Sequence, residues 1–167
     1  RARLGDWLYA VDAPGLEGRV LQLLKERGLT FSAAESCTGG LIAKRITDLS
    51  GASAVFRGGV VSYTNAVKAG VLGVPEELLA QYTAVSGPVA RAMAEGVRAL
   101  TGSDLAVSVT GVAGPGPDDD GHPEGLVYAA LTDGEHTWVR RLELGTGRGR
   151  IRVMAAHHAF DLLRRYL

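Results

Sequence analysis

The sequence predicts an α/β fold, a three-layer α/β/α sandwich with a mixed sheet between two layers of helices. Two observations support this fold class. Short apolar runs typical of buried strands alternate with longer stretches in which apolar residues recur every three or four positions, as on one face of a helix. Two later strand-like runs flank Asp133-Gly134, a dipeptide favoured in tight hairpin turns. The alternation favours parallel strands and the hairpin adds antiparallel ones, so a mixed sheet is expected.

The composition is that of one globular domain. The chain has 167 residues, of which 46% are hydrophobic, enough for a sizeable core and too apolar for a disordered chain. The formal net charge is zero, which is unfavourable for broad nucleic-acid binding. No apolar run approaches the length of a membrane span and no signal peptide is recognisable, so a cytoplasmic location is expected. The single cysteine excludes an internal disulfide.

The N-terminal segment differs from the rest. Residues 4–11 have the composition of a short strand, and Asp12-Ala13-Pro14-Gly15 would break it. We expect residues 1–15 to be a linker or the tail of an absent upstream domain, and residues 16–167 to form the domain itself.

The first part of the domain alternates helices and strands. A helix begins at Leu16 and ends at Gly28, a residue that often stops helices. An apolar run then predicts a strand that ends at Glu35, and the next helix begins near Leu41. The run from Val55 to Tyr63 predicts a second strand, whose glycine pair indicates a bulge or a close backbone approach.

The remaining elements complete the sandwich. A short helix carries Lys68, another begins at Pro75 and ends at Tyr82, and Ser86 caps a third that continues to Leu100. A strand is predicted at Leu105–Val109, hairpin strands at Leu126–Leu131 and Thr137–Leu144, and a final helix from Ile151 to Tyr166.

The turn Ser36-Cys37-Thr38-Gly39-Gly40, between the first strand and the next helix, is the strongest candidate site. Such a turn concentrates backbone N–H groups and the positive end of a helix dipole, which suits an anion or an oxyanion formed in a transition state. Ser36 is then a candidate nucleophile. The alternative is structural: Ser36 or Thr38 only caps the helix, and the glycines only make the turn.

Two further segments have an unusual composition. The loop Thr110–Pro117 is too rich in glycine and proline for an ordinary connection, so it is expected to be functional or mobile. Arg148, Arg150 and Arg152 lie at the start of the last helix, where cations oppose the helix dipole. A bound phosphate would explain at least one of them, with Arg148 the first candidate and Arg152 the second. The alternative is a solvated basic helix face.

No histidine lies in a glycine-rich turn, so a Ser-His-Asp triad is weakly supported. Cys37 is a rival nucleophile, although a small buried cysteine explains it better. The histidines and the cysteine lack metal-ligand spacing, so no metal is expected.

Four runs of the sequence carry a family resemblance. They are Ala34–Gly40, Gly59–Asn65 with Lys68, Val85-Ser86 and Thr110–Pro115, and Arg148 and Arg152 belong with them. In this order they closely resemble the C-terminal domain of the competence/damage-inducible protein CinA, over nearly the whole chain from about Leu16. The sequence departs from the family at Gly116–Asp120, where many members have a Gly-Gly pair, which leaves substrate contacts from this loop in doubt.

The resemblance implies an activity and a site. The implied activity is deamidation of nicotinamide mononucleotide to nicotinic acid mononucleotide and ammonia, without a cofactor, in pyridine nucleotide salvage. Ser36 matches the family's nucleophile, Lys68 its catalytic lysine and Tyr63 its tyrosine. Lys68 can accept a proton only if burial or positive neighbours lower its pKa, and from the residues alone it could equally be a solvated surface lysine. Tyr63 could relay the proton or orient the lysine, or only pack within a strand. The substrate-binding residues we expect are Thr38, Gly39, Gly40, Thr110, Gly111 and Arg148. The expected partners are a small nucleotide substrate, a second copy in a homodimer and, in a longer chain, an upstream nucleotide-hydrolase domain, with neither membrane nor nucleic acid.

Two other functions stay open from the sequence. A non-catalytic nucleotide-binding module attached to a nucleotide-hydrolase domain would bind nucleotide without releasing ammonia. A protein-interaction domain linked to competence or DNA repair would bind its partner whether or not Ser36 is present. The intact set of Ser36, Tyr63 and Lys68 favours the enzyme.

Overall fold

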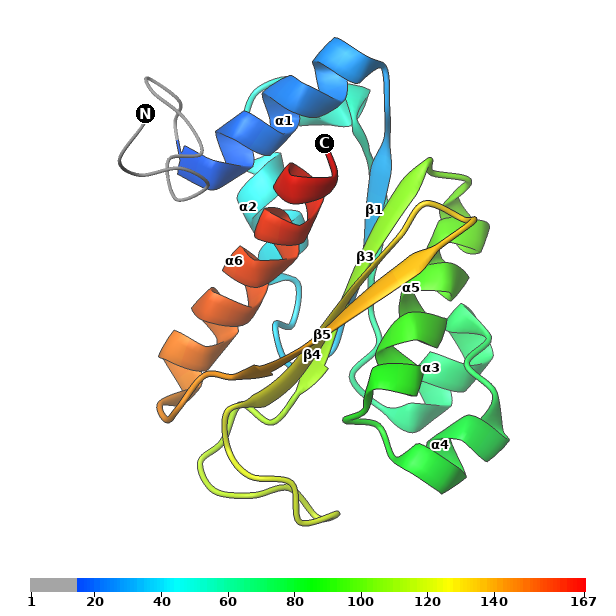
Figure 1. Ribbon diagram of the computed structural model, residues 1–167, viewed down its shortest axis with the longest axis vertical. Coiled ribbons are helices and arrows are strands. Elements are labelled where there is room, and N and C mark those ends of the chain that lie inside the picture. The colour runs from blue at the N-terminus through cyan, green and yellow to red at the C-terminus, as the bar shows by residue number, and fades with distance from the viewer. Residues whose placement is uncertain (1–14) are drawn as a thin grey trace.

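A computed structural model describes residues 15–167, which form a five-stranded mixed sheet in the order β2-β1-β3-β4-β5 (Figure 1). The strands are β1 Phe31–Glu35, β2 Phe56–Val61, β3 Leu105–Gly111, β4 Leu126–Thr132 and β5 Thr137–Glu143. The first three pair in parallel, and β4 and β5 add an antiparallel hairpin. The predicted fold class is confirmed. The strand expected at residues 4–11 lies outside the described residues.

Helices cover both faces of the sheet. On one face lie α1 Gly15–Arg27, α2 Leu41–Thr47 and α6 Arg148–Tyr166; on the other lie α3 Asn65–Leu72, α4 Glu76–Tyr82 and α5 Gly87–Thr101 (Figure 1). A short 3-10 helix at Ala52–Ala54, which the sequence pattern did not predict, precedes β2. Within residues 15–167, no helix has the length and apolar character needed to cross a membrane.

The core has two parts, one on each face of the sheet. Val107 and Val109 of β3 belong to the same buried cluster as Phe160 of α6, whereas the preceding residue Ala106 packs with Met93 of α5 on the other face. A strand covered by helices on both faces is buried along its length, which is why the run at 105–109, with Ser108 its one polar residue, shows no regular alternation.

The bulge predicted in the second strand is present. The pairing of β1 with β2 shifts between Phe31↔Phe56 and Ser32↔Gly58, so Arg57 is the extra residue. The close backbone approach is also present, because a Cβ on Gly59 would lie 3.2 Å from the carbonyl oxygen of Ala33. Both explanations offered for the glycine pair therefore apply.

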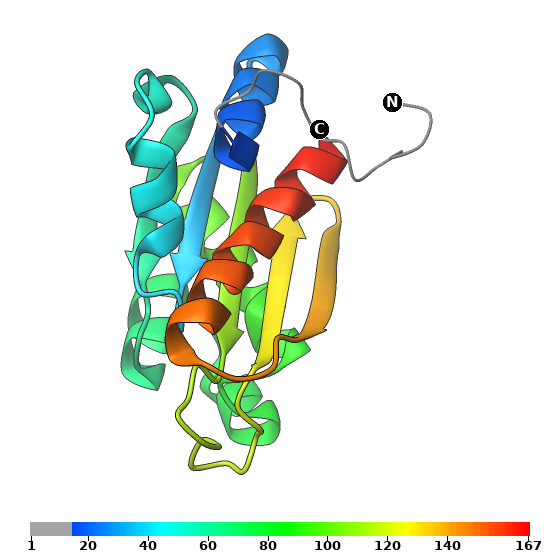
Figure 2. The ribbon, with the colours of Figure 1, turned by 90° about the vertical axis from the view of Figure 1, so that its left-hand side faces the viewer.

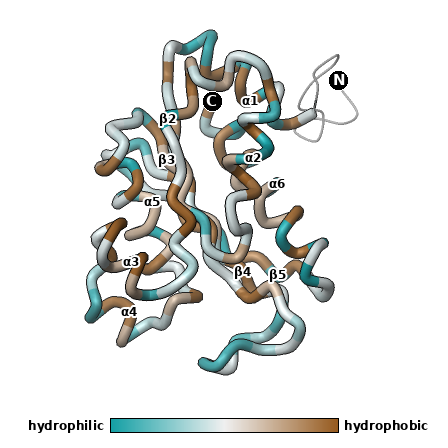
Figure 3. Tube along the Cα trace, turned by 180° about the vertical axis from the view of Figure 1, so that it is seen from behind, coloured by the Kyte–Doolittle hydropathy of each residue, from teal (hydrophilic) through white to brown (hydrophobic). Residues whose placement is uncertain are grey.

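The topology brings three chain segments together at the carboxyl ends of the parallel strands: the turn after β1, the loop after β3 and the start of α6. The chain leaves β1 through α2 on one face to reach β2, and returns through α3, α4 and α5 on the other face to β3. The carboxyl ends of β1 and β3 thus flank a point where the crossover changes side, which is where open α/β sheets bind ligands. Figure 2 shows that the start of α6 and the loop at residues 112–125 lie at the same end. Figure 3 shows that this loop is largely hydrophilic.

Helices α3 and α5 approach closely at Gly96, where a Cβ would collide with the carbonyl oxygen of Leu72. We expect Gly96→Ala to destabilise the fold by about 1–3 kcal/mol, because neither backbone can withdraw without disturbing the packing. Gly70→Ala is the matched control, since Gly70 lies in α3 with open space around its Cβ position. That substitution should be neutral or stabilise by about 0.4–1 kcal/mol. Urea unfolding of both variants measures the difference; equal effects would contradict the close approach.

Candidate active site

Ser36 lies directly after β1, and its backbone still follows the sheet, since its N–H donates to the carbonyl oxygen of Val109 in β3 (2.9 Å). The chain then turns sharply, with the N–H of Gly39 donating to the carbonyl oxygen of Ser36 (3.0 Å). Gly39 and Gly40 have φ values of 60° and 92°, in the left-handed region that side chains disfavour. The glycines are therefore needed for the turn, whatever else they do.

The group that caps α2 is Glu35, and neither Ser36 nor Thr38 does so. The Glu35 carboxylate is buried and accepts hydrogen bonds from the N–H groups of Gly40 (3.0 Å), Ile42 (3.0 Å) and Ala43 (2.9 Å). The positive end of α2, which the sequence suggested for a ligand or an oxyanion, thus holds an anion of the protein itself. The structural alternative was correct that this turn needs a cap, but it named the wrong residues.

Lys68 is buried against Ser36. Its side chain is 1% exposed, and its Nζ lies 3.2 Å from Ser36 Oγ and 2.7 Å from the carbonyl oxygen of Ser62. Burial lowers the pKa of the Lys68 ammonium below its usual range, and no carboxylate within the described residues forms an ion pair with it. The alternative of a solvated surface lysine is wrong. Ser62, which the sequence analysis did not single out, anchors the lysine.

The thiol of Cys37 is a poor rival to Ser36. Cys37 is 5% exposed, and burial raises the pKa of its thiol to about 12. A thiol is a nucleophile mainly as the thiolate, which is scarce near neutral pH at such a pKa. The expected small buried cysteine is confirmed.

Tyr63 and Arg148 pair with each other at the exposed rim. Arg148 donates from Nη2 to the Tyr63 hydroxyl (3.0 Å) and from Nη1 to the carbonyl oxygen of Gly114 (2.8 Å). Neither acceptor is charged, and Arg148 has no carboxylate partner among residues 15–167. Within the described part of the chain, no hydrogen bond joins Tyr63 to Lys68 or to Ser36. A catalytic role for Tyr63 stays a prediction, and its one observed partner is the arginine expected to bind phosphate.

The other expected substrate-binding residues have structural partners. Thr110 is buried and donates its hydroxyl to the carbonyl oxygen of Ala84 (2.8 Å). A Cβ on Gly111 would lie 2.6 Å from Cγ2 of Val127, its partner in β4, so the close pairing of β3 with β4 requires glycine there. Thr38 is fully buried, and its hydroxyl has no hydrogen-bond partner within the described part of the chain. The substrate-binding roles of these residues stay predictions.

Glu124 fixes the glycine-rich loop, a role that the sequence did not reveal. Its carboxylate accepts from the N–H groups of Gly116 (2.9 Å) and Gly147 (2.8 Å), so it joins the loop to the start of α6. The hydrogen bonds from Gly147 and Gly116 lower the pKa of this carboxyl group. The partners lie 8 and 23 residues from Glu124 in the chain, and no local sequence signal connects them.

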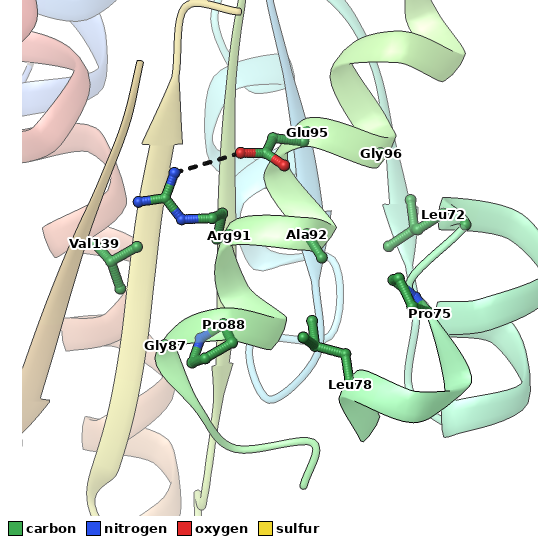
Figure 4. Close-up of a pocket in the computed structure, with 11 residues that line it drawn as sticks. Leu72, Pro75, Leu78, Gly87, Pro88, Arg91, Ala92, Glu95, Gly96 and Val139 are labelled. Carbon is green, nitrogen blue, oxygen red and sulfur yellow. Dashed lines mark ion pairs between the residues drawn. The ribbon is translucent and has the colours of Figure 1, made fainter. Parts of the chain in front are cut away.

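Two features lie outside this site. Asp118, Asp120 and His122 place a potential ligand atom each within 4.8 Å of the others, but exposed acidic groups of this kind are common without a metal. The expectation of no metal stays a prediction. An apolar groove of about 660 Å³ runs between α4 and α5, with the Arg91–Glu95 ion pair at its edge (Figure 4). None of the residues that line this groove belongs to the Ser36 turn or to the loop at residues 112–125.

Comparison with known proteins identifies the family. The family model of the CinA C-terminal domain matches residues 14–167. The CinA-like protein of Geobacter sulfurreducens is 50% identical over 167 residues, and that of Desulfovibrio desulfuricans is 49% identical over 170 residues. These alignments cover 100% of this chain and 40% of each relative, so the chain spans well under half the length of these relatives.

Solved structures of proteins from the same family have the same fold as this chain. The competence/damage-inducible protein CihA of Agrobacterium tumefaciens has a TM-score of 0.86 at 38% identity, covering 92% of this chain and 97% of that chain. A CinA superfamily protein of Klebsiella pneumoniae has a TM-score of 0.87 at 32% identity, covering 90% and 94% respectively. The chain belongs to the CinA C-terminal domain family, and the resemblance proposed from the sequence is confirmed.

Proposed function

We propose that this domain hydrolyses the carboxamide of nicotinamide mononucleotide, releasing ammonia and nicotinic acid mononucleotide. The observation that carries the proposal is the contact of Ser36 Oγ with the buried Nζ of Lys68 at 3.2 Å. A serine becomes a nucleophile beside a base, and a desolvated lysine of lowered pKa is such a base. The choice of substrate rests on the family resemblance. Arg148, a cation hydrogen-bonded to neutral groups only, supports a substrate that carries a phosphate.

The first half of the reaction forms an acyl-enzyme. Neutral Lys68 takes the proton of the Ser36 hydroxyl while Oγ bonds to the amide carbon, and the carbonyl electron pair moves onto oxygen. The carbonyl then reforms, the C–N bond breaks, and protonated Lys68 gives its proton to the leaving nitrogen. Ammonia departs and an ester of Ser36 remains.

The second half repeats these steps with water. Lys68, neutral again, takes a proton from a water molecule whose oxygen attacks the ester carbon. The bond to Oγ then breaks and Lys68 returns the proton to Ser36, which leaves the acid form of the product. The carbonyl oxygen of Ser62 holds Nζ in place throughout, 2.7 Å away.

The test of the proposal is ammonia release from nicotinamide mononucleotide by the purified domain. Ser36→Ala should reduce the turnover by about 10⁴-fold or more, because the nucleophile is lost, while substrate binding measured by calorimetry should persist. Substantial turnover by the alanine variant would transfer the role to another residue. Nucleotide binding by the parent without any ammonia would instead favour the non-catalytic module.

Lys68→Arg should be nearly as inactive as Lys68→Ala, with a loss of about 10²–10⁴-fold in kcat. A guanidinium remains protonated, so it can supply charge at this position but cannot accept the serine proton. For the parent, kcat/KM should rise with pH as Lys68 loses its proton, and the midpoint should lie below the ordinary lysine pKa of about 10.4, since burial lowers it. An active Lys68→Arg enzyme would show that the lysine acts as a charge rather than as the base.

Arg148→Ala should weaken kcat/KM for the mononucleotide by about 10–30-fold, as expected for the loss of one charge-assisted contact. The matching riboside, which lacks the phosphate, is the control substrate, and its kcat/KM should hardly change. Equal losses on both substrates would mean that Arg148 acts through Tyr63 and Gly114 and does not bind phosphate.

A further inference from the structure

Arg152, the second phosphate candidate from the sequence, has its guanidinium against the Ser36 turn. Its Nε donates to the carbonyl oxygen of Cys37 (3.2 Å), and its Nη2 donates to that of Thr38 (2.9 Å). A Cβ on Gly39 would lie 3.3 Å from Nη2, so the turn passes directly beneath the guanidinium. One side chain from α6 thus holds two consecutive carbonyl groups beside the nucleophile.

These two contacts also determine where the neighbouring N–H groups point. A trans peptide group is planar, and its C=O and N–H point in opposite directions. Fixing the carbonyl of Cys37 therefore fixes the N–H of Thr38, and fixing the carbonyl of Thr38 fixes the N–H of Gly39. The N–H of Gly39 donates to the carbonyl oxygen of Ser36 (3.0 Å), which closes the turn. This contact in turn fixes the N–H of Cys37, because it belongs to the same peptide group as the Ser36 carbonyl.

Two N–H groups of the turn have no acceptor in another residue. Within residues 15–167, the N–H groups of Ser36, Gly39 and Gly40 donate to other residues, whereas that of Thr38 does not and that of Cys37 contacts only its own thiol sulfur. These two directly follow the nucleophile in the chain. Backbone N–H groups in this relation to a nucleophilic serine are suited to hold the negative oxygen of a tetrahedral intermediate.

We propose that Arg152 is a positioning residue, which holds the peptide groups of the turn so that the N–H groups of Cys37 and Thr38 stabilise the oxyanion. The inference rests on the proposed amide hydrolysis, and it gives Arg152 a role other than the phosphate binding considered from the sequence. An arginine suits this role because its planar fork fixes two oxygens in one orientation, which a lysine ammonium does not. The positive charge of Arg152 also lowers the pKa of the Cys37 thiol against the larger effect of burial, so its field reaches the turn.

The first experiment compares Arg152→Lys and Arg152→Gln with the control Arg150→Gln. Arg150 lies on the same helix and donates to the carbonyl oxygen of Leu144, away from the turn. We expect both Arg152 variants to lose about 10²-fold in kcat on the mononucleotide and on the riboside alike, with little change in KM. The control should retain the parent kcat. A loss confined to the phosphorylated substrate, or one in KM alone, would make Arg152 a phosphate ligand and overturn the proposal.

The second experiment measures the oxyanion site without turnover of an amide. In a mononucleotide with an aldehyde in place of the carboxamide, Ser36 Oγ bonds to the aldehyde carbon, the carbonyl pair moves onto oxygen, and Lys68 takes the serine proton. The affinity of the enzyme for this aldehyde should fall in the Arg152 variants by the same factor as kcat/KM for the amide, because aldehyde binding and amide hydrolysis form the same oxyanion. An unchanged affinity in variants of reduced kcat would contradict the proposal.

Labelling by a fluorophosphonate separates this proposal from the proposed function. Ser36 Oγ attacks phosphorus, the P–F bond breaks, fluoride leaves, and Lys68 takes the proton. The rate of labelling should fall about 10²-fold in Arg152→Lys, since the phosphoryl oxygen needs the same N–H groups. If the parent is labelled but releases no ammonia, the proposed substrate is wrong, and the labelling rates still decide the role of Arg152. Equal rates in the parent and in a folded Arg152→Lys variant would refute it.

Discussion

The carboxylate of Glu35 is the group on which the geometry of this site depends. A buried carboxylate is strongly unfavourable unless its oxygens are hydrogen-bonded, and here it accepts three N–H groups at the start of α2. The same residue uses its carbonyl oxygen to accept the N–H of Ser62 (2.8 Å), whose own carbonyl holds Lys68. One residue therefore links the turn that carries Ser36 to the strand end that holds the lysine.

The sheet order makes this convergence attainable. Because β1 lies between two parallel strands, its carboxyl end has β2 on one side and β3 on the other. Lys68 follows from the end of β2, and the loop after β3 provides the carbonyl group of Gly114 to Arg148. Helix α6 then returns to the same edge with two arginines that differ in their partners. Arg148 contacts exposed groups at the rim, whereas Arg152 contacts the turn itself.

Local patterns predicted the elements well, because helix and strand periodicity and glycine stops are properties of short stretches. The polar partners were not predictable in that way. Spacing could not show that Lys68 is buried, since its burial depends on α3 placing it against Ser36 in the turn after β1, and only the family resemblance favoured a catalytic lysine. Glu35 was seen as the last residue of a strand, although its side chain caps the next helix. Glu124 and Arg152 act on segments 23 and 115 residues away, distances at which one sequence carries no pairing signal.

The distribution of charge around Lys68 supports its proposed role as a base. A carboxylate paired with Lys68 would raise the pKa of its ammonium and keep it protonated near neutral pH. The acidic residue next to Ser36 in the chain is Glu35, and its carboxylate oxygens accept hydrogen bonds from N–H groups at the start of α2. Lys68 instead has a serine hydroxyl and a peptide carbonyl as its partners, both uncharged. The α2 cap thus stabilises the turn and also engages the Glu35 carboxylate away from the lysine, so burial sets the direction of the Lys68 pKa shift against a smaller opposing effect of Cys37.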